Sequence, residues 1–141
     1  MTYKNKIPPI DVPIISDGIC SIENLSNLFK HKKIIIFGVP GAFTPTCTDK
    51  HLPGFIALYD QIIDKGIDDI FCLSVNDKFV MQSWLLSFES VNKIKGIADG
   101  NTEITKYLNL LTDKTSNFMG MRCFRFAMIV ENNTIKELFV D

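Results

Sequence analysis

The feature that most constrains this chain is an alternation of short apolar runs with segments of helical periodicity. The runs "KKIIIFGV" at 32–39 and "DIFCLSV" at 69–75 are typical of strands that are buried on both faces of a sheet. Between them, residues 45–65 carry apolar side chains at helical spacing, and Gly66 closes this helix. Strands that alternate with helices predict a parallel sheet with helices on both of its faces.

The rest of the chain extends this pattern. Pro53 lies inside the first long helix and should kink it or begin its second part. Asn132 and Asn133 tolerate positive φ and predict a two-residue hairpin between the last two strands. The order of elements predicts a thioredoxin-like α/β fold, with a central mixed sheet, helices on both faces and a C-terminal β-hairpin. The other elements expected are an extended entry at 8–13, helices over 21–30, 77–88 (capped by Asn76) and 102–110, and strands over 93–99, 123–131 and 134–141.

Length and charge limit the organisation and the partners. A chain of 141 residues suits one domain, residues 1–141, and a net charge of −1 gives no electrostatic footprint for nucleic acid or anionic lipid. No apolar run approaches the roughly 20 residues that span a bilayer, and the N-terminus lacks the apolar core of a signal peptide. We therefore expect a cytoplasmic protein with no nucleic-acid or membrane partner. A thioredoxin-like sheet normally receives a helix after its last strand, whereas this sequence stops at Asp141, just after that strand. Two explanations are open: an unusually short protein, or a sequence that is cut before the C-terminal helix.

Residues 40–47, "PGAFTPTC", follow the first buried strand directly. With Thr44 at the N-cap and Pro45 at the first helical position, Cys47 falls in the first turn of the helix. Its sulfur then lies where backbone N–H groups are unpaired and the helix dipole is positive, and both effects favour the thiolate. Cysteines in such positions can have pKa values of about 3.5–7.5, against about 8.5 when free. We expect Cys47 to be an activated nucleophile.

The neighbours of Cys47 suit a small substrate that carries oxygen. Thr44 has a hydroxyl that can accept from the helix N-terminus and still donate to a substrate oxygen. Pro40 has no N–H and presents an apolar wall that would keep water from the sulfur, whereas Gly41 lets the backbone approach closely.

The spacing of Pro40, Thr44 and Cys47 is the pattern P-x-x-x-T-x-x-C, which resembles that of the peroxiredoxins. The longer string "GVPGAFTPTC…HLPGF" resembles the type-5 (type II, atypical) group of that family. Three further segments resemble the same group: "CLSVND" at 72–77, the helix around Trp84 and "RFAMIV" at 125–130. The resemblance therefore runs from about residue 33 to residue 141.

The resemblance implies a thiol-dependent peroxidase that reduces hydrogen peroxide and organic hydroperoxides without a metal or organic cofactor. The Cys47 thiolate would attack a peroxide oxygen, release water or alcohol and become a sulfenic acid. The family's arginine maps onto Arg125, whose planar fork of donors would hold the thiolate and the peroxide oxygens. Arg122 lies before the expected strand and ranks lower, and Thr44 and Pro40 complete the catalytic set.

Further side chains are candidates for the pocket. The resemblance places Thr46, Phe43 and Phe118 near the substrate. The aromatic residues Phe43, Phe79, Trp84 and Phe118 could also belong to the core or to a dimer face. His51 follows Cys47 by one helical turn and could tune the sulfur, or bond a loop carbonyl instead. A zinc site at Cys47 and His51 would need two more ligands and is disfavoured.

The sulfenic acid needs a second thiol. Cys72 matches a resolving cysteine of some family members, but its apolar run predicts burial in mid-sheet, out of reach of Cys47 without local unfolding. We expect one-cysteine behaviour, with glutathione, a glutaredoxin-like partner or thioredoxin as the external thiol reductant. Cys20 lies near an irregular N-terminal segment, and Cys123 opens the strand that is expected to carry Arg125.

An aromatic cluster is expected on surface loops, at Phe43, Phe79 and Trp84. Such clusters more often mark an interface than bare surface, and the family resemblance points the same way. We therefore expect a homodimer through these loops.

Two other functions compete with the peroxidase. A thiol–disulfide oxidoreductase is disfavoured because Thr44 occupies the position where a C-x-x-C motif would hold its other cysteine. A thioredoxin-fold interaction module with little or no turnover is the second alternative, and a Cys47 that reacts with peroxide no faster than free cysteine would favour it.

Overall fold

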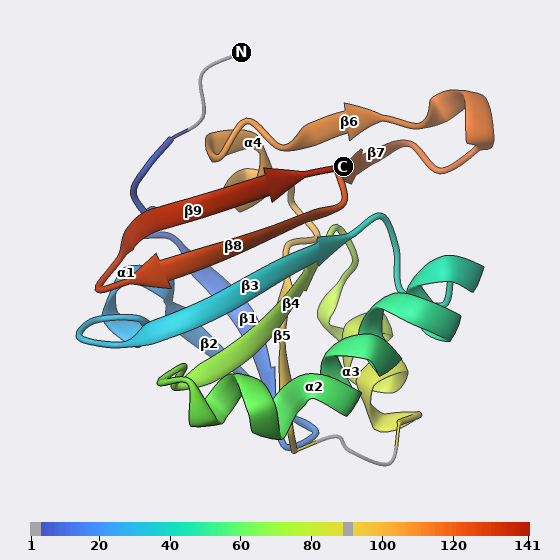
Figure 1. Ribbon diagram of the computed structural model, residues 1–141. Helices are drawn as coiled ribbons and strands as arrows, with labels where there is room; N and C mark the ends of the chain where they lie inside the picture. The colour runs from blue at the N-terminus through green and yellow to red at the C-terminus, as the bar shows by residue number, and fades with distance from the viewer. Residues whose placement is uncertain (1–3, 89–91) are drawn as a thin grey trace.

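The computed structural model describes residues 4–88 and 92–141, and the side chains of Cys47 and Asp49 lie outside this description. A seven-stranded sheet with the order β2-β1-β5-β4-β3-β8-β9 forms the centre, and β6 and β7 form a small second sheet (Figure 1). The strands are β1 (Asp11–Ser16), β2 (Ile19–Asn24), β3 (Lys33–Val39), β4 (Asp69–Ser74), β5 (Ile94–Ala98), β6 (Leu111–Asp113), β7 (Met121–Cys123), β8 (Phe126–Glu131) and β9 (Thr134–Val140). The α-helices are α1 (Leu25–Leu28), α2 (Leu52–Asp64), α3 (Lys78–Leu86) and α4 (Glu103–Tyr107).

The middle of the large sheet is parallel and its two sides are antiparallel. β4 pairs in parallel with both β3 and β5. β8 and β9 continue antiparallel beside β3, and β1 and β2 continue antiparallel beside β5. Asn132 and Asn133 make the turn between β8 and β9 with φ of +46° and +67°. The predicted mixed sheet and C-terminal hairpin are confirmed.

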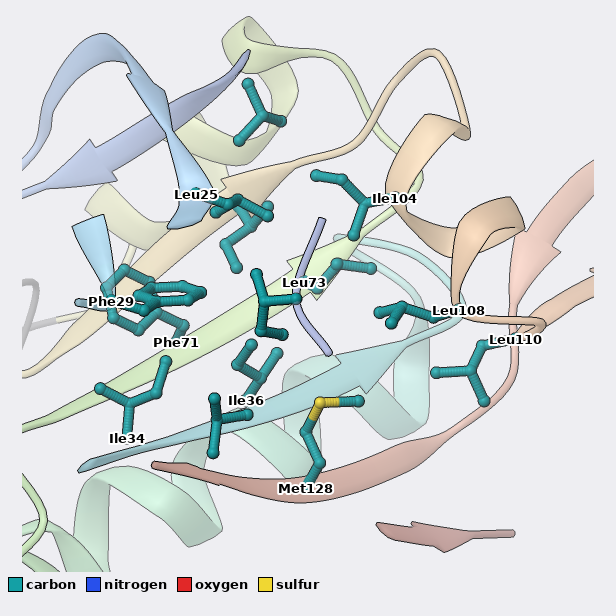
Figure 2. Packing of buried hydrophobic residues seen from close by; sticks show 14 of the residues in the cluster. Leu25, Phe29, Ile34, Ile36, Phe71, Leu73, Ile104, Leu108, Leu110 and Met128 are labelled. Carbon is teal, nitrogen blue, oxygen red and sulfur yellow. The ribbon is translucent and has the colours of Figure 1, made fainter. Parts of the chain in front are cut away.

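Apolar side chains pack on both faces of the sheet. One cluster joins the sheet to α1 and α4, and the other joins it to α2 and α3. Because the strands β3 and β4 contribute to both clusters, their short apolar runs are buried on both sides, as the sequence predicts. Figure 2 shows the first cluster, which includes Leu25, Phe29, Ile34, Ile36, Phe71, Leu73, Ile104, Leu108, Leu110 and Met128.

The N-terminal part differs from the prediction. β1 and β2 form a hairpin whose turn residues, Asp17 and Gly18, have φ of +53° and +77°. An Asp-Gly pair is a strong hairpin signal, so this turn could have been found from the sequence. The helix predicted over 21–30 is only the four-residue α1, because the residues up to Asn24 pair with β1 instead.

The strand predicted over 123–131 is divided in two. β7 ends at Cys123 and pairs with β6, whereas β8 begins at Phe126. Cys123 therefore does not open the strand that carries Arg125. Arg125 lies directly before β8, and Arg122 lies inside β7.

The first long helix is α-helical at Pro45 and Thr46, passes through a π-helical turn, Cys47–His51, and continues as α2. Pro53 is the second residue of α2, so it begins the second part of the helix, as predicted. Pro53 has no N–H for the carbonyl of Asp49, and its ring crowds that carbonyl, so the turn before it cannot keep α-helical geometry. Single π-helical turns are rare and occur frequently at functional sites. The turn that starts at Cys47 is therefore a candidate site on backbone geometry alone.

Candidate active site

The segment before Cys47 lies at the carboxyl end of the parallel strands. β3 ends at Val39, and the next three residues, Pro40, Gly41 and Ala42, are all buried. Ligands of open α/β sheets bind outside the carboxyl ends of the strands. The buried Pro40 is consistent with an apolar wall at this edge, and the backbone leads from there to the π-helical turn.

Thr44 makes the bend between the loop and the helix. Its hydroxyl donates to the carbonyl of Gly41 at 2.7 Å, and its own carbonyl accepts from the N–H of Thr48 at 2.9 Å. The carbonyl therefore begins the helix, as expected of an N-cap residue. The single hydroxyl proton of Thr44 is therefore donated within the loop, and not to a substrate as expected. The lone pairs of the hydroxyl oxygen remain as acceptors.

Asn76 has a different role from the predicted one. The cap of α3 is Asp77, whose Oδ1 accepts from the N–H of Val80 at 2.8 Å. Asn76 Oδ1 instead accepts from the N–H of Ala42 at 2.9 Å and from the hydroxyl of Ser74. The end of β4 thereby holds the loop that leads to Cys47.

Arg125 and His51 face one cavity of about 350 Å³. Arg125 Nε and His51 Nδ1 are both buried and make no hydrogen bond within the part of the chain that the structure describes. One wall contains the rings of Phe37 and Phe55, which stack with centroids 3.9 Å apart. Since His51 ends the π-helical turn that Cys47 begins, Arg125 is brought to the same turn as Cys47. The lining is completed by Phe126, Ala127, Phe139, Val140 and Asp141.

The surroundings of His51 favour its neutral imidazole over the protonated form. Burial lowers the pKa of His51 below its usual value of 6.5, and the neighbouring Arg125 guanidinium lowers it further, while Asp141 opposes the shift. A protonated His51 would place a second cation against Arg125. The neutral ring leaves Arg125 as the cation of this cavity, beside the start of the helix.

The stability of the protein should depend on pH through His51. Because the pKa of His51 is lower in the folded than in the unfolded chain, the unfolded chain binds more protons as pH falls through about 6.5. The free energy of unfolding should therefore fall between about pH 7.5 and pH 5.5, and less so in His51→Gln. Urea denaturation at several pH values measures both slopes. Parallel curves for the two proteins would contradict the neutral His51.

Trp84 lies in a helix, as predicted, and is fully buried in α3, so it belongs to the core and not to the aromatic cluster expected on surface loops. Its indole Nε1 donates to Thr48 Oγ1 at 3.1 Å. Thr48 directly follows Cys47, so α3 fixes the π-helical turn through this bond. Sequence reasoning missed this contact, and the only available signal was that a buried indole N–H must find an acceptor.

Three aromatic residues predicted near the pocket or an interface are exposed. Phe43, Phe79 and Phe118 expose 55%, 71% and 98% of their surface. Phe43 and Phe118 also have φ of +62° and +60°, which is uncommon for bulky residues and marks sharply bent loops. Thr46 is exposed in the first turn of the helix. None of these aromatic rings belongs to the buried core.

The cysteines other than Cys47 are placed as follows. Cys72 is buried in β4, between Phe37 of β3 and Gly96 of β5, as predicted. Cys123 is buried at the end of β7, where its Sγ donates to the carbonyl of Val39 at 3.1 Å. Cys20 is half-buried on the edge strand β2.

Within residues 4–88 and 92–141, no helix has both the length and the apolar composition that crossing a membrane requires.

Comparison with known families and proteins places the chain clearly. Residues 5–141 match the family model described as Redoxin. Peroxiredoxin-2D of Arabidopsis thaliana is 48% identical over 134 residues, which cover 88% of this chain and 83% of that protein.

Solved structures give the same result. The antioxidant protein of Plasmodium falciparum, a 1-Cys peroxiredoxin, has a TM-score of 0.91 at 39% identity and covers 100% of this chain and 84% of its own. Reduced Prx3 of Vibrio vulnificus in complex with hydrogen peroxide has a TM-score of 0.90 at 38% identity, with 100% and 88% covered. Peroxiredoxin 5 of Alvinella pompejana has a TM-score of 0.86 at 29% identity, with 100% and 90% covered. This chain, with its thioredoxin fold and its Cys47 turn, therefore belongs to the peroxiredoxin family, in the type-5 group, and is a thiol-dependent peroxidase that acts on peroxides with a thiol as reductant.

Proposed function

We propose that Cys47 is the nucleophile of this peroxidase. The Cys47 thiolate attacks one oxygen of the peroxide, the O–O bond breaks, and the second oxygen leaves as water or alcohol once it takes up a proton. The sulfur is oxidised to a sulfenic acid, and the peroxide is reduced by the same two electrons. The observation that carries this assignment is the π-helical turn, which begins at Cys47 and ends at His51 beside Arg125.

Arg125, Thr44 and Pro40 are the proposed partners of Cys47. Arg125 has a buried Nε without a partner, so a donor is available for the thiolate or for a peroxide oxygen without breaking an existing bond at that atom. Pro40 is buried at the start of the loop, directly after β3, and excludes water. Thr44 supplies acceptor lone pairs, because its proton is held by Gly41. His51 tunes this set by remaining neutral beside Arg125.

The proposed substrates are hydrogen peroxide and organic hydroperoxides. The exposed Phe43 and Phe118 offer apolar surface for the organic part of a hydroperoxide, and the exposed Thr46 lies in the helical turn directly before Cys47. A similar protein, Vibrio vulnificus Prx3, has been solved in complex with hydrogen peroxide, which supports the smaller substrate.

We expect the sulfenic acid to be resolved by an external thiol. Cys72 is fully buried between two neighbouring strands, so a disulfide with Cys47 would require part of the sheet to open. The similarity to a 1-Cys peroxiredoxin of Plasmodium falciparum supports the same mechanism. After one equivalent of peroxide, peptide mass spectrometry should find sulfenic acid at Cys47, or a mixed disulfide when glutathione is added. A dominant Cys47–Cys72 disulfide would contradict this proposal.

The reductant is proposed to be glutathione, a glutaredoxin-like protein or thioredoxin. Each needs a reducing compartment, for which the cytoplasm is the proposed location. Coupled assays with each reductant at the same peroxide concentration rank the three, and imaging of the tagged protein in its own cell tests the location.

A homodimer is proposed through Phe43 and Phe79. The bond between Ala42 and Asn76 joins the loop of Phe43 to the segment that leads into α3, whose second residue is Phe79, and both rings are exposed. Trp84 is excluded from this interface because it is buried. Phe79→Glu should raise the dimer dissociation constant at least about tenfold in sedimentation experiments, since it places a charge in an apolar contact. Phe139→Glu, another exposed aromatic residue, is the control, and a wild-type protein that stays monomeric at high concentration would exclude the dimer.

A further inference from the structure

Arg122 joins three chain segments at the edge of the candidate site. Its Nε donates to the carbonyl of Met119 at 2.9 Å, and its Nη1 donates to the carbonyl of Val75 at 3.0 Å. Met119 belongs to the loop between β6 and β7, and Val75 directly follows β4. One planar guanidinium therefore holds this loop against the end of a central strand.

The third segment is the loop that contains Gly41 and Thr44. A Cβ added to Gly41 would come within 3.3 Å of Arg122 Nη1, 3.1 Å of the Thr44 methyl group and 3.7 Å of Met119 Cε. The bare α-carbon of Gly41 is thus the surface on which Arg122, Met119 and Thr44 converge. The positions of Thr44 and of the loop around Met119 are coupled through this contact.

The loop that Arg122 holds carries Phe118. Its base is closed by backbone bonds between Lys114 and Gly120, at 2.7 Å, and between Met119 and Lys114, at 3.1 Å. Phe118 follows a short 3₁₀ turn, has φ of +60° and is almost fully exposed. The loop is therefore stiff within itself, and the two bonds of Arg122 fix where it places Phe118 relative to Thr44.

We propose that Arg122 is a positioning residue that sets the ratio of the rates at which this peroxidase reduces bulky organic hydroperoxides and hydrogen peroxide. The proposal rests on the proposed function, in which peroxide oxygens meet Cys47 beside Thr44. A bulky substituent must extend from there over the neighbouring loops, where Phe118 offers apolar surface. Hydrogen peroxide has no such substituent, so displacement of the loop changes its reaction less.

The fork geometry of Arg122 distinguishes this role from a general effect of charge. The ammonium of a lysine is a point charge and cannot reproduce two N–H donors in a fixed plane. Arg122→Lys should therefore behave like Arg122→Met if Arg122 positions the loop. It should behave like the wild type if only a positive charge near Cys47 is needed.

The test measures second-order rate constants for cumene hydroperoxide and for hydrogen peroxide with the full chain. The ratio of the two rate constants should fall about tenfold in both Arg122→Lys and Arg122→Met. Lys114→Met removes a cation from the same loop and should leave the ratio unchanged. A ratio that stays at the wild-type value in both Arg122 variants, or that is retained in Arg122→Lys alone, would overturn the proposal.

A second variant keeps the test valid if the Arg122 variants fold poorly, as judged by thermal denaturation. Phe118→Ala should lower the same ratio by a similar factor. Where Arg122→Met does fold, adding it to Phe118→Ala should lower the ratio no further, because the two residues act through one loop. Fully additive losses, or an unchanged ratio in Phe118→Ala, would also overturn the proposal. A wild-type protein that reacts with neither peroxide faster than free cysteine would instead overturn the proposed function.

Discussion

Cys47→Ser should abolish peroxide reduction, with a loss of at least about 10³-fold in the rate constant. A serine hydroxyl is not ionised at neutral pH and cannot carry the two-electron oxidation of a sulfur, so no other group in the loop can replace it. Peroxide consumption with excess thiol reductant measures the effect. Cys20→Ser, on the edge strand β2, is the matched control and should keep wild-type activity. Residual activity of Cys47→Ser at the wild-type level would contradict the assignment.

Arg125→Ala should slow the reaction with hydrogen peroxide by about 10²–10³-fold, because it removes fixed donors aimed at the reacting oxygens. Arg122→Ala should cost less with this small substrate, since its guanidinium bonds backbone carbonyls of Met119 and Val75. Both are measured as second-order rate constants for oxidation of the reduced protein. Equal losses in the two variants would mean that the wrong arginine has been assigned.

Removing Arg125 also tests whether this arginine helps to keep Cys47 ionised as a thiolate. Absorbance titration of a variant that keeps only Cys47 should give a midpoint within about 3.5–7.5, because the helix N-terminus favours the thiolate. Removing Arg125 should raise this midpoint. A midpoint above about 8 in the presence of Arg125 would contradict the activated thiolate.

The central strands and the hairpin of Asn132 and Asn133 could be predicted because their signals are local. The apolar runs that became β3 and β4 are buried on both faces, and this pattern has few alternatives. The turn at Asp17 and Gly18 was equally local and was missed, although the Asp-Gly pair encodes it.

The features that could not be predicted depend on tertiary contacts. Asn76 and Asp77 are both good helix caps in sequence, and only the position of Ala42 decides that Asn76 bonds the loop. The sequence leaves Trp84 open between the core and an interface because its acceptor, Thr48, is 36 residues away along the chain. Such pairings are invisible to periodicity, which reports only which face of a helix is apolar.

The candidate site also contains features that follow from local sequence and features that depend on tertiary contacts. Pro40, Thr44 and Cys47 are close in sequence, so their pattern could be recognised as a unit. The role of Arg122 could not be predicted from the sequence, because it bonds the backbone carbonyls of Met119 and Val75, and every residue has such a carbonyl. The separation of β7 from β8, which places Arg125 outside a strand, also depends on the pairing of β7 with β6.

The most direct test of the peroxidase centre is the rate at which reduced Cys47 is oxidised by hydrogen peroxide. Rapid-quench samples of the wild-type chain, trapped with a sulfenic acid reagent and mapped by mass spectrometry, give this rate for each cysteine separately. We expect Cys47 to be oxidised orders of magnitude faster than free cysteine, while Cys20, Cys72 and Cys123 remain reduced. Oxidation of Cys47 no faster than free cysteine, or earlier oxidation of another cysteine, would contradict its assignment as the nucleophile.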